Sequence, residues 1–193
     1  MIFNIIAVIV SYFLGNINPA ILVSRALGGD IREKGSGNAG TTNMLRVYGK
    51  KAAAATFLID ILKGTAAVIL GRLIGGDAVS YACGFACICG HIWPAVWGFR
   101  GGKGIATGFG VLLGIAPSYA ICELLVAILF FVTTKMISPG SLAAAFAMPA
   151  LAREFAPGFG PYAFVLMCIV FFKHRSNIKR LLKGEESKVS FKK

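Results

Sequence analysis

A cluster of glycines, hydroxyl side chains and one arginine stands in the segment 35–46 of the chain. Residues 35–43 read Gly-Ser-Gly-Asn-Ala-Gly-Thr-Thr-Asn, and Arg46 follows three positions later. Glycines let backbone N–H groups converge on an anion, hydroxyls donate further hydrogen bonds, and arginine binds two phosphate oxygens at once. The spacing also matches the GxGxxG pattern of dinucleotide-binding folds, but the charged residues 30–34 precede it where that fold requires a buried strand. We therefore expect a phosphate site and exclude a dinucleotide fold.

A second glycine-rich segment, 98–104, contains Arg100 and Lys103 and precedes an apolar run that begins at Ile105. It has the composition of a P-loop, but that motif requires Gly at position 97 and Ser or Thr at position 104, where the chain has Trp and Gly. The segment predicts instead a helix N-terminus at which backbone donors, the helix dipole and two cations attract an anion. The alternative is a turn whose cations reflect only the positive-inside bias and whose glycines allow tight packing.

Two further polar segments lie beside apolar runs. Residues 138–141 read Ser-Pro-Gly-Ser, and we expect Ser141 to begin a helix and to present free N–H groups there. The tail 174–185 is basic and places three apolar residues on one face, which is typical of an interfacial helix attracted by anionic lipid. The three glycine or hydroxyl turns together predict one shared anion pocket.

The apolar runs between these segments indicate the class of protein. The 193 residues are 56% apolar with a mean hydropathy of +0.74, above the roughly 45–50% apolar content of soluble domains. Such runs recur along nearly the whole chain, so we expect an all-α integral membrane protein with a single membrane-embedded domain over residues 1–193. The first run lacks a basic leader and a small-residue cleavage site, and we expect it to be a retained span.

The apolar runs predict a bundle of about seven short transmembrane helices. Several runs are shorter than the roughly 20 residues of a straight crossing, so burial in the bundle or local membrane thinning must accompany them. The expected spans are residues 2–24, 52–74, 79–97, 104–116, 118–134, 141–152 and 159–173.

The cations are unevenly distributed between the loops, and their distribution predicts the orientation. With seven spans, one side of the membrane receives residues 25–51, 100–103, 135 and 173–193, which hold 17 of the 20 Lys and Arg residues. The opposite loops contain only Arg72 and Arg153. By the positive-inside rule we expect the N-terminus outside, the C-terminus in the cytoplasm and every polar segment above on the cytoplasmic side.

Several reactive side chains fall inside the expected spans. Asp60 and Lys63 stand three positions apart where charge is costly, and we expect them to pair as a structural clamp, with direct catalysis as the alternative. Cys83, Cys87 and His91 would share one helix face and offer metal ligands, but no fourth ligand is apparent. The five cysteines all lie in apolar runs, which argues against a disulfide framework.

The ordered set of motifs resembles the bacterial acyl-phosphate-dependent glycerol-3-phosphate acyltransferases, the PlsY family, over nearly the whole chain. Ala39, Thr41 and Arg100 depart from the usual residues of that family without removing a functional group. The resemblance rests on Asp30-Ile31-Arg32, Gly35-Ser36-Gly37-Asn38, Thr42-Asn43, Arg46, Gly90-His91, Pro94, Phe99, Gly101-Gly102-Lys103-Gly104, Ala106-Thr107, His174-Arg175 and Asn177-Ile178.

The resemblance implies that a fatty acyl group passes from an acyl phosphate to the 1-hydroxyl of glycerol 3-phosphate, giving lysophosphatidic acid and phosphate. The HxxxxD pattern of other glycerolipid acyltransferases is missing, since Val96 and Lys179 stand five residues after the two histidines. The expected partners are glycerol 3-phosphate, acyl phosphate and membrane lipids, with no cofactor, no metal and no nucleic acid. The expected location is the bacterial cytoplasmic (inner) membrane, with a multi-pass chain and an active site that faces the cytoplasm.

The resemblance also implies the site, in which Ser36, His174 and Asn177 are the expected catalytic residues. Arg46 and Lys103 are assigned to the phosphate of glycerol 3-phosphate, Ser36 and Asn177 to the glycerol or the oxyanion, and Thr41, Gly102 and Ser141 to the acyl phosphate. His174 orients or deprotonates the acceptor hydroxyl, or has a structural hydrogen bond instead. Glu185 holds the tail against a cation. The expected substrate-binding residues are Gly37, Thr41, Asn43, Arg46, Gly101, Gly102, Lys103, Ser141 and Glu185.

The alternative function is a membrane transporter of a small organic phosphate, because broken helices with anion-binding ends also build transporters. Transport needs access from both sides, whereas the polar motifs gather on one side and no inverted repeat is visible. A non-catalytic scaffold for anionic lipids would explain the basic tail but not the glycine-rich segments. The sequence therefore favours the enzyme.

Overall fold

The computed structural model describes residues 1–189, which form α-helices and short 3-10 helices without any strand. Helices follow the apolar runs because backbone N–H and C=O groups in lipid must be satisfied within the chain. The all-α fold expected from the sequence is confirmed for these residues. The chain forms two compact units, Met1–Ile115 and Ala116–Lys193.

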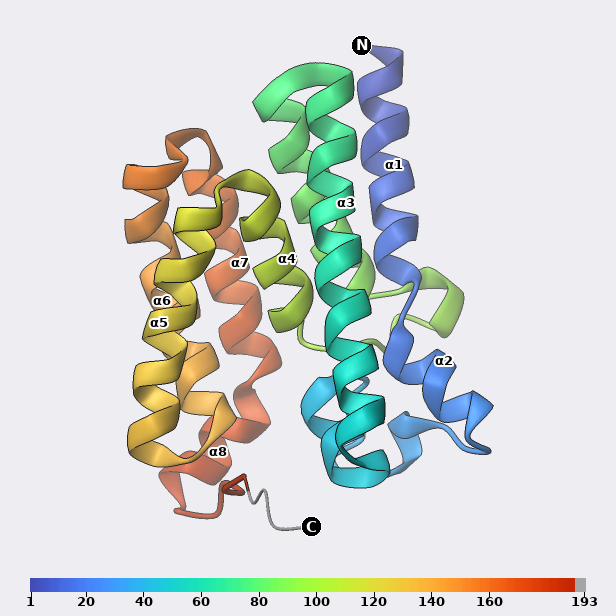
Figure 1. Cartoon of the computed structure of the whole chain (residues 1–193), viewed down its shortest axis with the longest axis vertical. Coiled ribbons are helices and arrows are strands. Elements are labelled where there is room, and N and C mark those ends of the chain that lie inside the picture. Colours follow the sequence, from blue (N-terminus) through green and yellow to red (C-terminus); the bar gives the residue numbers. More distant parts are fainter. Residues whose placement is uncertain (190–193) are drawn as a thin grey trace. The chain divides into compact units, whose positions relative to one another are not determined.

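The first unit is built on a long helical segment that folds back on itself. α3 extends over Thr41–Ile92, but Gly49, Gly75 and Gly76 have non-helical backbone angles. At Gly75 and Gly76 the chain reverses, so that Figure 1 shows an ascending limb (50–74) and a descending limb (77–92). Gly76 has a φ of 70°, a left-handed value that favours glycine. α1 (Ile2–Asn16) and α4 (Ile105–Ile115) both pack against α3.

α1 and the descending limb of α3 approach each other through two glycines. A Cβ atom at Gly15 would lie 2.1 Å from the carbonyl oxygen of Cys87, and one at Gly90 would lie 2.0 Å from that of Tyr12. Only glycine allows two helix backbones to come this close. We call this contact the α1–α3 seam, and the Tyr12 hydroxyl extends it by donating to the Trp93 carbonyl at 2.7 Å.

The first apolar run is interrupted after Asn16. α2 (Pro19–Ala26) starts at a proline, and the Asn18 side chain caps it by accepting a hydrogen bond from the Ile21 N–H at 3.2 Å. Proline lacks an N–H group and suits the first position of a helix, while asparagine is a favoured N-cap. These two residues explain why one run forms two helices.

The second unit begins with two long helices, α5 (Pro117–Thr134) and α6 (Ile137–Phe155), which pack against each other. A short turn, η3 (Pro157–Phe159), leads into α7 (Gly160–Lys173), which packs against α6. The amphipathic α8 (Arg175–Leu182) follows after a bend of 59°. The tail was expected to form such a helix.

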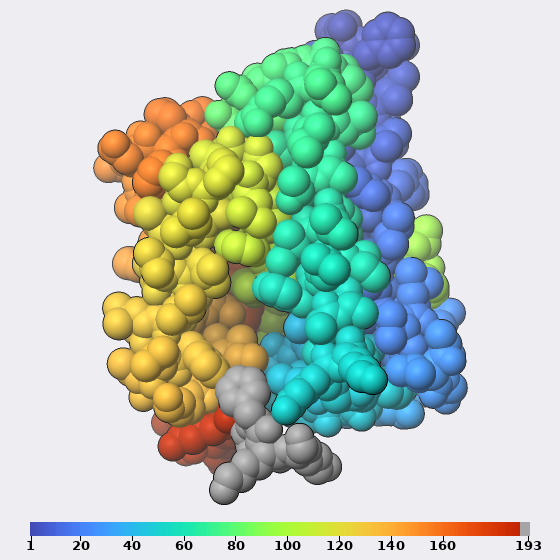
Figure 2. All heavy atoms as spheres, in the orientation of Figure 1, coloured from blue at the N-terminus to red at the C-terminus, as the bar shows by residue number. Residues whose placement is uncertain are grey.

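Within residues 1–189, three helical stretches are long and apolar enough to cross a membrane: Ile2–Ala26, Thr41–Trp97 and Pro117–Thr134. The bent pair of α7 and α8 brings this to four if it counts as one span. The side chains of α3 and of α5 each form a broad surface of their own unit in Figure 2, and both helices expose large apolar residues, among them Leu73 and Leu129. Apolar surface of this extent suits contact with lipid. The count of seven spans and the sides of the two termini stay predictions.

Candidate functional site

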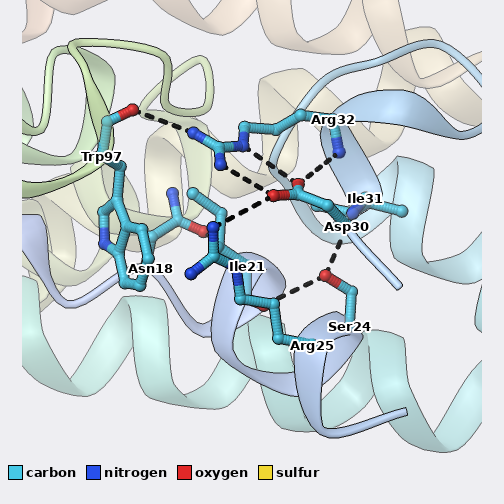
Figure 3. Close-up of polar contacts among 8 residues, drawn as sticks. All are labelled: Asn18, Ile21, Ser24, Arg25, Asp30, Ile31, Arg32 and Trp97. Carbon is cyan, nitrogen blue, oxygen red and sulfur yellow. Dashed lines mark hydrogen bonds and ion pairs between the residues drawn. The ribbon is translucent and has the colours of Figure 1, made fainter. Parts of the chain in front are cut away.

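The first polar loop is fixed by an ion pair between Asp30 and Arg32, which Figure 3 shows in close-up. Arg32 lies in η1 (Ile31–Glu33), and its Nε and Nη2 are 3.0 and 2.7 Å from the two Asp30 oxygens. The hydrogen bond from the Arg32 side chain outweighs burial and holds the pKa of Asp30 well below its usual range. Arg32 Nη1 also donates to the carbonyl of Trp97, in η2 (Ala95–Trp97), at 2.9 Å. The pair therefore ties the first loop to the start of the second.

Asn43 holds the shape of the phosphate-type loop from within. Its Oδ1 accepts a hydrogen bond from the Ser36 N–H at 2.9 Å, and its Nδ2 donates to the carbonyls of Ile31 and Lys34 at 3.2 and 2.9 Å. The side chain is almost completely buried, whereas Ser36 is exposed. Asn43, predicted to bind substrate, is thus a residue that positions Ser36.

Thr41 is the first residue of α3 and has an unusual hydroxyl. Its Oγ1 is buried and has no hydrogen-bond partner among residues 1–189. The N-terminus of a helix has unpaired N–H groups and a favourable dipole for anions. Arg46 stands little more than one turn further along, is exposed, and its side chain forms no hydrogen bond or ion pair within the described residues. This end of α3 therefore offers a hydroxyl and a guanidinium to a ligand.

The glycines of the second loop are required by close packing. A Cβ atom at Gly101 would lie 2.0 Å from the His91 carbonyl oxygen, and one at Gly102 would lie 2.1 Å from His91 Nε2 and 2.7 Å from the Ala39 carbonyl oxygen. The N–H groups of Gly101 and Gly102 donate to the carbonyls of Ile92 and His91 at 3.3 and 3.2 Å. These two backbone donors, expected to bind an anion, thus have partners within the protein. The contact with Ala39 brings the second loop beside the start of α3.

The expected pair of Asp60 and Lys63 is confirmed, with Lys63 Nζ 2.8 Å from Asp60 Oδ1. His91 joins this pair instead of the two cysteines that share its helix face. Cys87 donates its thiol to the Lys63 carbonyl at 3.7 Å. No group of three or more possible metal ligands occurs within residues 1–189.

In the second unit, a carboxylate that sequence reasoning missed organises the polar residues. Glu186 Oε1 accepts hydrogen bonds from the Ser138 hydroxyl and from Asn177 Nδ2, the latter at 2.6 Å. Its Oε2 is 2.7 Å from Arg180 Nε. Burial raises the pKa of Glu186, but the hydrogen bonds from Ser138, Asn177 and Arg180 outweigh it and hold the pKa below its usual value. The group is therefore an ionised acceptor at neutral pH.

His174 lies about one helical turn before Asn177, at the junction of α7 and α8. Its Nδ1 is 2.8 Å from the carbonyl oxygen of Val170 and must carry the hydrogen that it donates there. In the neutral ring Nε2 then has no hydrogen. His174 is 3% exposed. Its hydrogen bond to Val170 is the structural hydrogen bond that the sequence analysis considered for this residue.

Two residues of the second unit, Ser141 and Glu185, do not make the contacts expected of them. α6 begins at Ile137, four residues before Ser141, so Ser141 lies inside the helix and donates to the Ile137 carbonyl at 3.2 Å. Ser138, in the first turn, makes the contact with Glu186. Glu185 is exposed, and its neighbour Glu186 forms the ion pair expected for it. Both carboxylates follow Gly184 in the sequence, and no local signal distinguishes them.

The predicted site residues divide between the two units. The first unit brings its two loops together at Ala39 and Gly102, and the second gathers its polar residues around Glu186. The first unit holds Ser36, Gly37, Thr41, Asn43, Arg46, Gly101, Gly102 and Lys103, and the second holds Ser141, His174, Asn177 and Glu185.

Comparison with known proteins gives a consistent result. The family model for glycerol-3-phosphate acyltransferase matches residues 5–184. The chain is 41% identical over 193 residues to a glycerol-3-phosphate acyltransferase of Thermoanaerobacter sp. (strain X514), with 98% of both chains covered. It is 44% identical over 197 residues to a glycerol-3-phosphate acyltransferase of Clostridioides difficile (strain 630), and the match covers 98% of this chain and 97% of the relative.

Two solved structures are similar to this one. The crystal structure of PlsY, an integral membrane glycerol 3-phosphate acyltransferase, in its glycerol 3-phosphate form superimposes with a TM-score of 0.92 at 32% identity, covering 97% of this chain and 96% of that chain. Its lysophosphatidic acid form gives a TM-score of 0.89 at the same identity, covering 97% and 95%.

Proposed function

Because the chain belongs to the glycerol-3-phosphate acyltransferase family, we propose that it transfers a fatty acyl group from an acyl phosphate to the 1-hydroxyl of glycerol 3-phosphate. The products are lysophosphatidic acid and inorganic phosphate, and the reaction is a step of phospholipid synthesis. The glycerol 3-phosphate and lysophosphatidic acid forms of the similar PlsY structures support the acceptor and the product. The choice of donor rests on the resemblance of the sequence motifs to the acyl-phosphate-dependent acyltransferases.

The buried hydroxyl of Thr41 is the observation on which the proposed site rests. A buried hydroxyl without a partner costs free energy, so an oxygen of a bound phosphate supplies what Thr41 Oγ1 lacks among residues 1–189. The α3 N-terminus adds backbone donors and a positive dipole end. Ala39, two residues earlier, touches Gly102, which places the second loop within the same region.

In the first unit, Arg46 and Lys103 bind the phosphate of glycerol 3-phosphate, since Arg46 lies in the second turn of α3 and Lys103 in the second glycine-rich loop. Ser36 donates to the glycerol or to the oxyanion, and Asn43 acts by holding Ser36 in place. Gly37 gives the loop its turn with a φ of 70°. Thr41 and Gly102 line the acyl phosphate.

In the second unit, Asn177 orients the acceptor or the oxyanion. Glu186 replaces Glu185 as the carboxylate that holds the tail, through its contacts with Asn177 and Arg180. Hydrogen bonds to an ionised carboxylate are stronger than those between neutral groups, so Glu186 fixes the orientation of the Asn177 amide.

The chemistry requires little from the protein beyond positioning. An acyl phosphate is a mixed anhydride, so the acceptor oxygen bonds to the acyl carbon while the bond from that carbon to the phosphate oxygen breaks. The electron pair leaves with the phosphate, and fixed donors stabilise the oxyanion that forms on the way. The acceptor proton passes to the departing phosphate or to His174 Nε2, which has no hydrogen in the neutral ring.

The membrane explains how a water-soluble acceptor meets a lipid donor. The exposed apolar residues of α3 and α5 suit contact with acyl chains, so the fatty chain lies in lipid while the phosphate groups lie at the polar loops. We assign the protein to the bacterial cytoplasmic membrane with the site facing the cytoplasm, because the polar loops hold most of the cations.

Phosphate release by the purified protein tests the proposal. The detergent-solubilised chain is supplied with palmitoyl phosphate and glycerol 3-phosphate, and we expect phosphate and lysophosphatidic acid in equal amounts. Palmitoyl-CoA in place of palmitoyl phosphate should give no product. Equal product from both donors would contradict the proposed donor, and no product from either would contradict the proposed reaction. Uptake of glycerol 3-phosphate into vesicles without a donor would favour the transporter.

A further inference from the structure

A buried cluster of three ionisable side chains lies inside the first unit, beneath the glycine-rich loop. Asp60, Lys63 and His91 are 1%, 4% and 3% exposed. Lys63 Nζ and His91 Nδ1 are 2.8 and 3.1 Å from Asp60 Oδ1, and they are 2.9 Å from each other. Charges at membrane depth are costly and persist where they serve a site.

Lys63 connects this cluster to the break in the first apolar run. Its ammonium group donates to the carbonyls of Gly15 and Ile17 at 3.1 and 2.7 Å. Carbonyl groups at the end of a helix have no partner within the helix. Lys63 therefore fixes the end of α1, and with it the point from which α2 and the first polar loop depart.

Asp60 and His91 connect the same cluster to the second loop. Asp60 Oδ1 is 3.5 Å from the Thr107 hydroxyl in the first turn of α4, four residues after Lys103. The His91 carbonyl accepts from the Gly102 N–H, and His91 Nε2 lies directly against Gly102. The imidazole ring of His91 is held at Nδ1 by Asp60 and lies against Gly102 at Nε2. The ring thus supports the turn that precedes Lys103.

We propose that Asp60, Lys63 and His91 are positioning residues that fix the Gly101–Lys103 turn relative to the first loop and so determine the affinity for glycerol 3-phosphate. None of the three touches substrate. This inference rests on the proposed function, in which Lys103 and Arg46 bind the acceptor phosphate. It assigns His91 to the Gly102 contact, although its spacing from Cys87 suggested a metal ligand.

The test separates the fold from the positioning of the turn. Asp60→Asn or Lys63→Met alone leaves a buried charge without its partner, and we expect a low yield of folded protein. The double variant removes both charges and should recover the yield and the symmetric elution profile of the wild type. Its KM for glycerol 3-phosphate should nevertheless rise about tenfold, because Lys103 in this turn binds the acceptor phosphate. Its KM for palmitoyl phosphate should rise less, because Thr41 on α3 lines that phosphate together with Gly102.

Two histidine variants extend the test. His91→Asn keeps a polar nitrogen near Asp60, and its KM for glycerol 3-phosphate should stay closer to the wild-type value than that of His91→Leu. Asp77→Asn is the control, because it removes a carboxylate from the exposed Arg72 pair at the start of the descending limb. A well-folded double variant with wild-type KM values for both substrates would overturn the inference.

Binding of glycerol 3-phosphate without donor distinguishes the two proposals. The shift of the melting temperature with glycerol 3-phosphate concentration gives an affinity that does not depend on turnover. A wild type that binds but releases no phosphate would contradict the proposed reaction alone, and the variants would still test positioning by binding. A wild type that turns over while the double variant binds equally well would contradict the positioning alone. A wild type that does not bind glycerol 3-phosphate would contradict both.

Discussion

The amide nitrogen of Asn177 lies 2.6 Å from Oε1 of Glu186. An ionised carboxylate accepts hydrogen bonds only, so this contact turns Nδ2 of Asn177 toward Glu186 and Oδ1 to the opposite side. The carboxylate is itself fixed by Ser138 and Arg180. The orientation of a proposed catalytic amide is therefore set by a residue from the tail.

Replacing Glu186 by Gln should disturb this arrangement. The neutral amide weakens the acceptor for Asn177 and Arg180, at a cost of about 1.5–3 kcal/mol for hydrogen bonds to a charged group. We expect kcat to fall at least tenfold in the phosphate-release assay. Glu185→Gln, at the exposed neighbouring position, should behave like the wild type, and equal losses in the two variants would contradict the assignment of Glu186.

The ion pair of Asp30 and Arg32 predicts a dependence of stability on acid pH. The pKa of Asp30 is lowered in the folded protein, so the pair stabilises the fold above the unfolded pKa and is lost as pH falls through the folded value. Melting temperature should therefore decline below about pH 4, the usual pKa region of aspartate. In Asp30→Asn the melting temperature should be lower at pH 7 and should change less between pH 7 and pH 3. Parallel curves for the two proteins would exclude a contribution from Asp30.

Removal of Arg46 should weaken acceptor binding. Loss of a charge-assisted contact with phosphate costs about 1.5–3 kcal/mol, which corresponds to a KM for glycerol 3-phosphate raised about ten- to a hundredfold in Arg46→Ala. Lys103→Ala should have a similar effect. Lys51→Ala removes an exposed cation from the same end of α3 and should leave KM nearly unchanged. A similar KM increase in Lys51→Ala would point to the overall charge instead of a specific contact.

Removal of the Thr41 hydroxyl should leave the stability of the protein equal or higher but should weaken substrate binding. In Thr41→Val the buried hydroxyl, which finds no partner in the described part of the chain, is replaced by a methyl group of similar size, so stability should be equal or higher. The KM for palmitoyl phosphate should nevertheless rise roughly tenfold, since a ligand oxygen loses its donor. Thr56→Val, which loses a hydroxyl that donates to Ala52 within α3, should keep its wild-type KM. Unchanged kinetics in Thr41→Val would remove Thr41 from the site.

The second loop should tolerate no side chain at Gly102. In Gly102→Ala the Cβ atom would meet His91 Nε2 at 2.1 Å and the Ala39 carbonyl oxygen at 2.7 Å, and the loop would have to move. We expect phosphate release to fall by about two orders of magnitude or more, consistent with a misplaced site. Gly108→Ala, where the nearest atom is 3.9 Å away in the interior of α4, should remain active. Wild-type activity in Gly102→Ala would contradict the packing described here.

Local patterns predicted the helices and one ion pair. Apolar runs locate α4 and α5 to within one or two residues, because lipid requires the backbone to be satisfied within each segment. Asp60 and Lys63 stand three positions apart on one helix, so their pairing follows from spacing alone. Pro19, which lacks an N–H group, stands where the first run breaks into α1 and α2.

Contacts between distant segments were not predictable in the same way. His91 meets Asp60 across the fold-back of α3, and helical spacing pointed to the cysteines instead. Glu186 and Glu185 are chemically identical, and only the three-dimensional positions of Ser138, Asn177 and Arg180 distinguish them. The glycines at 101 and 102 suggested anion binding by composition, whereas their close approach to His91 is visible only in three dimensions.

The α1–α3 seam leaves little space beside the buried charge of Lys63. The Gly15 and Gly90 backbones approach so closely that no methyl group fits between the helices, and a file of water molecules needs more room than that. The buried charges around Lys63 lie where α1 ends at this seam. Charged groups inside a membrane otherwise invite leakage of ions and protons. We expect the tight glycine contact to keep water from reaching the buried Lys63 ammonium group along this seam.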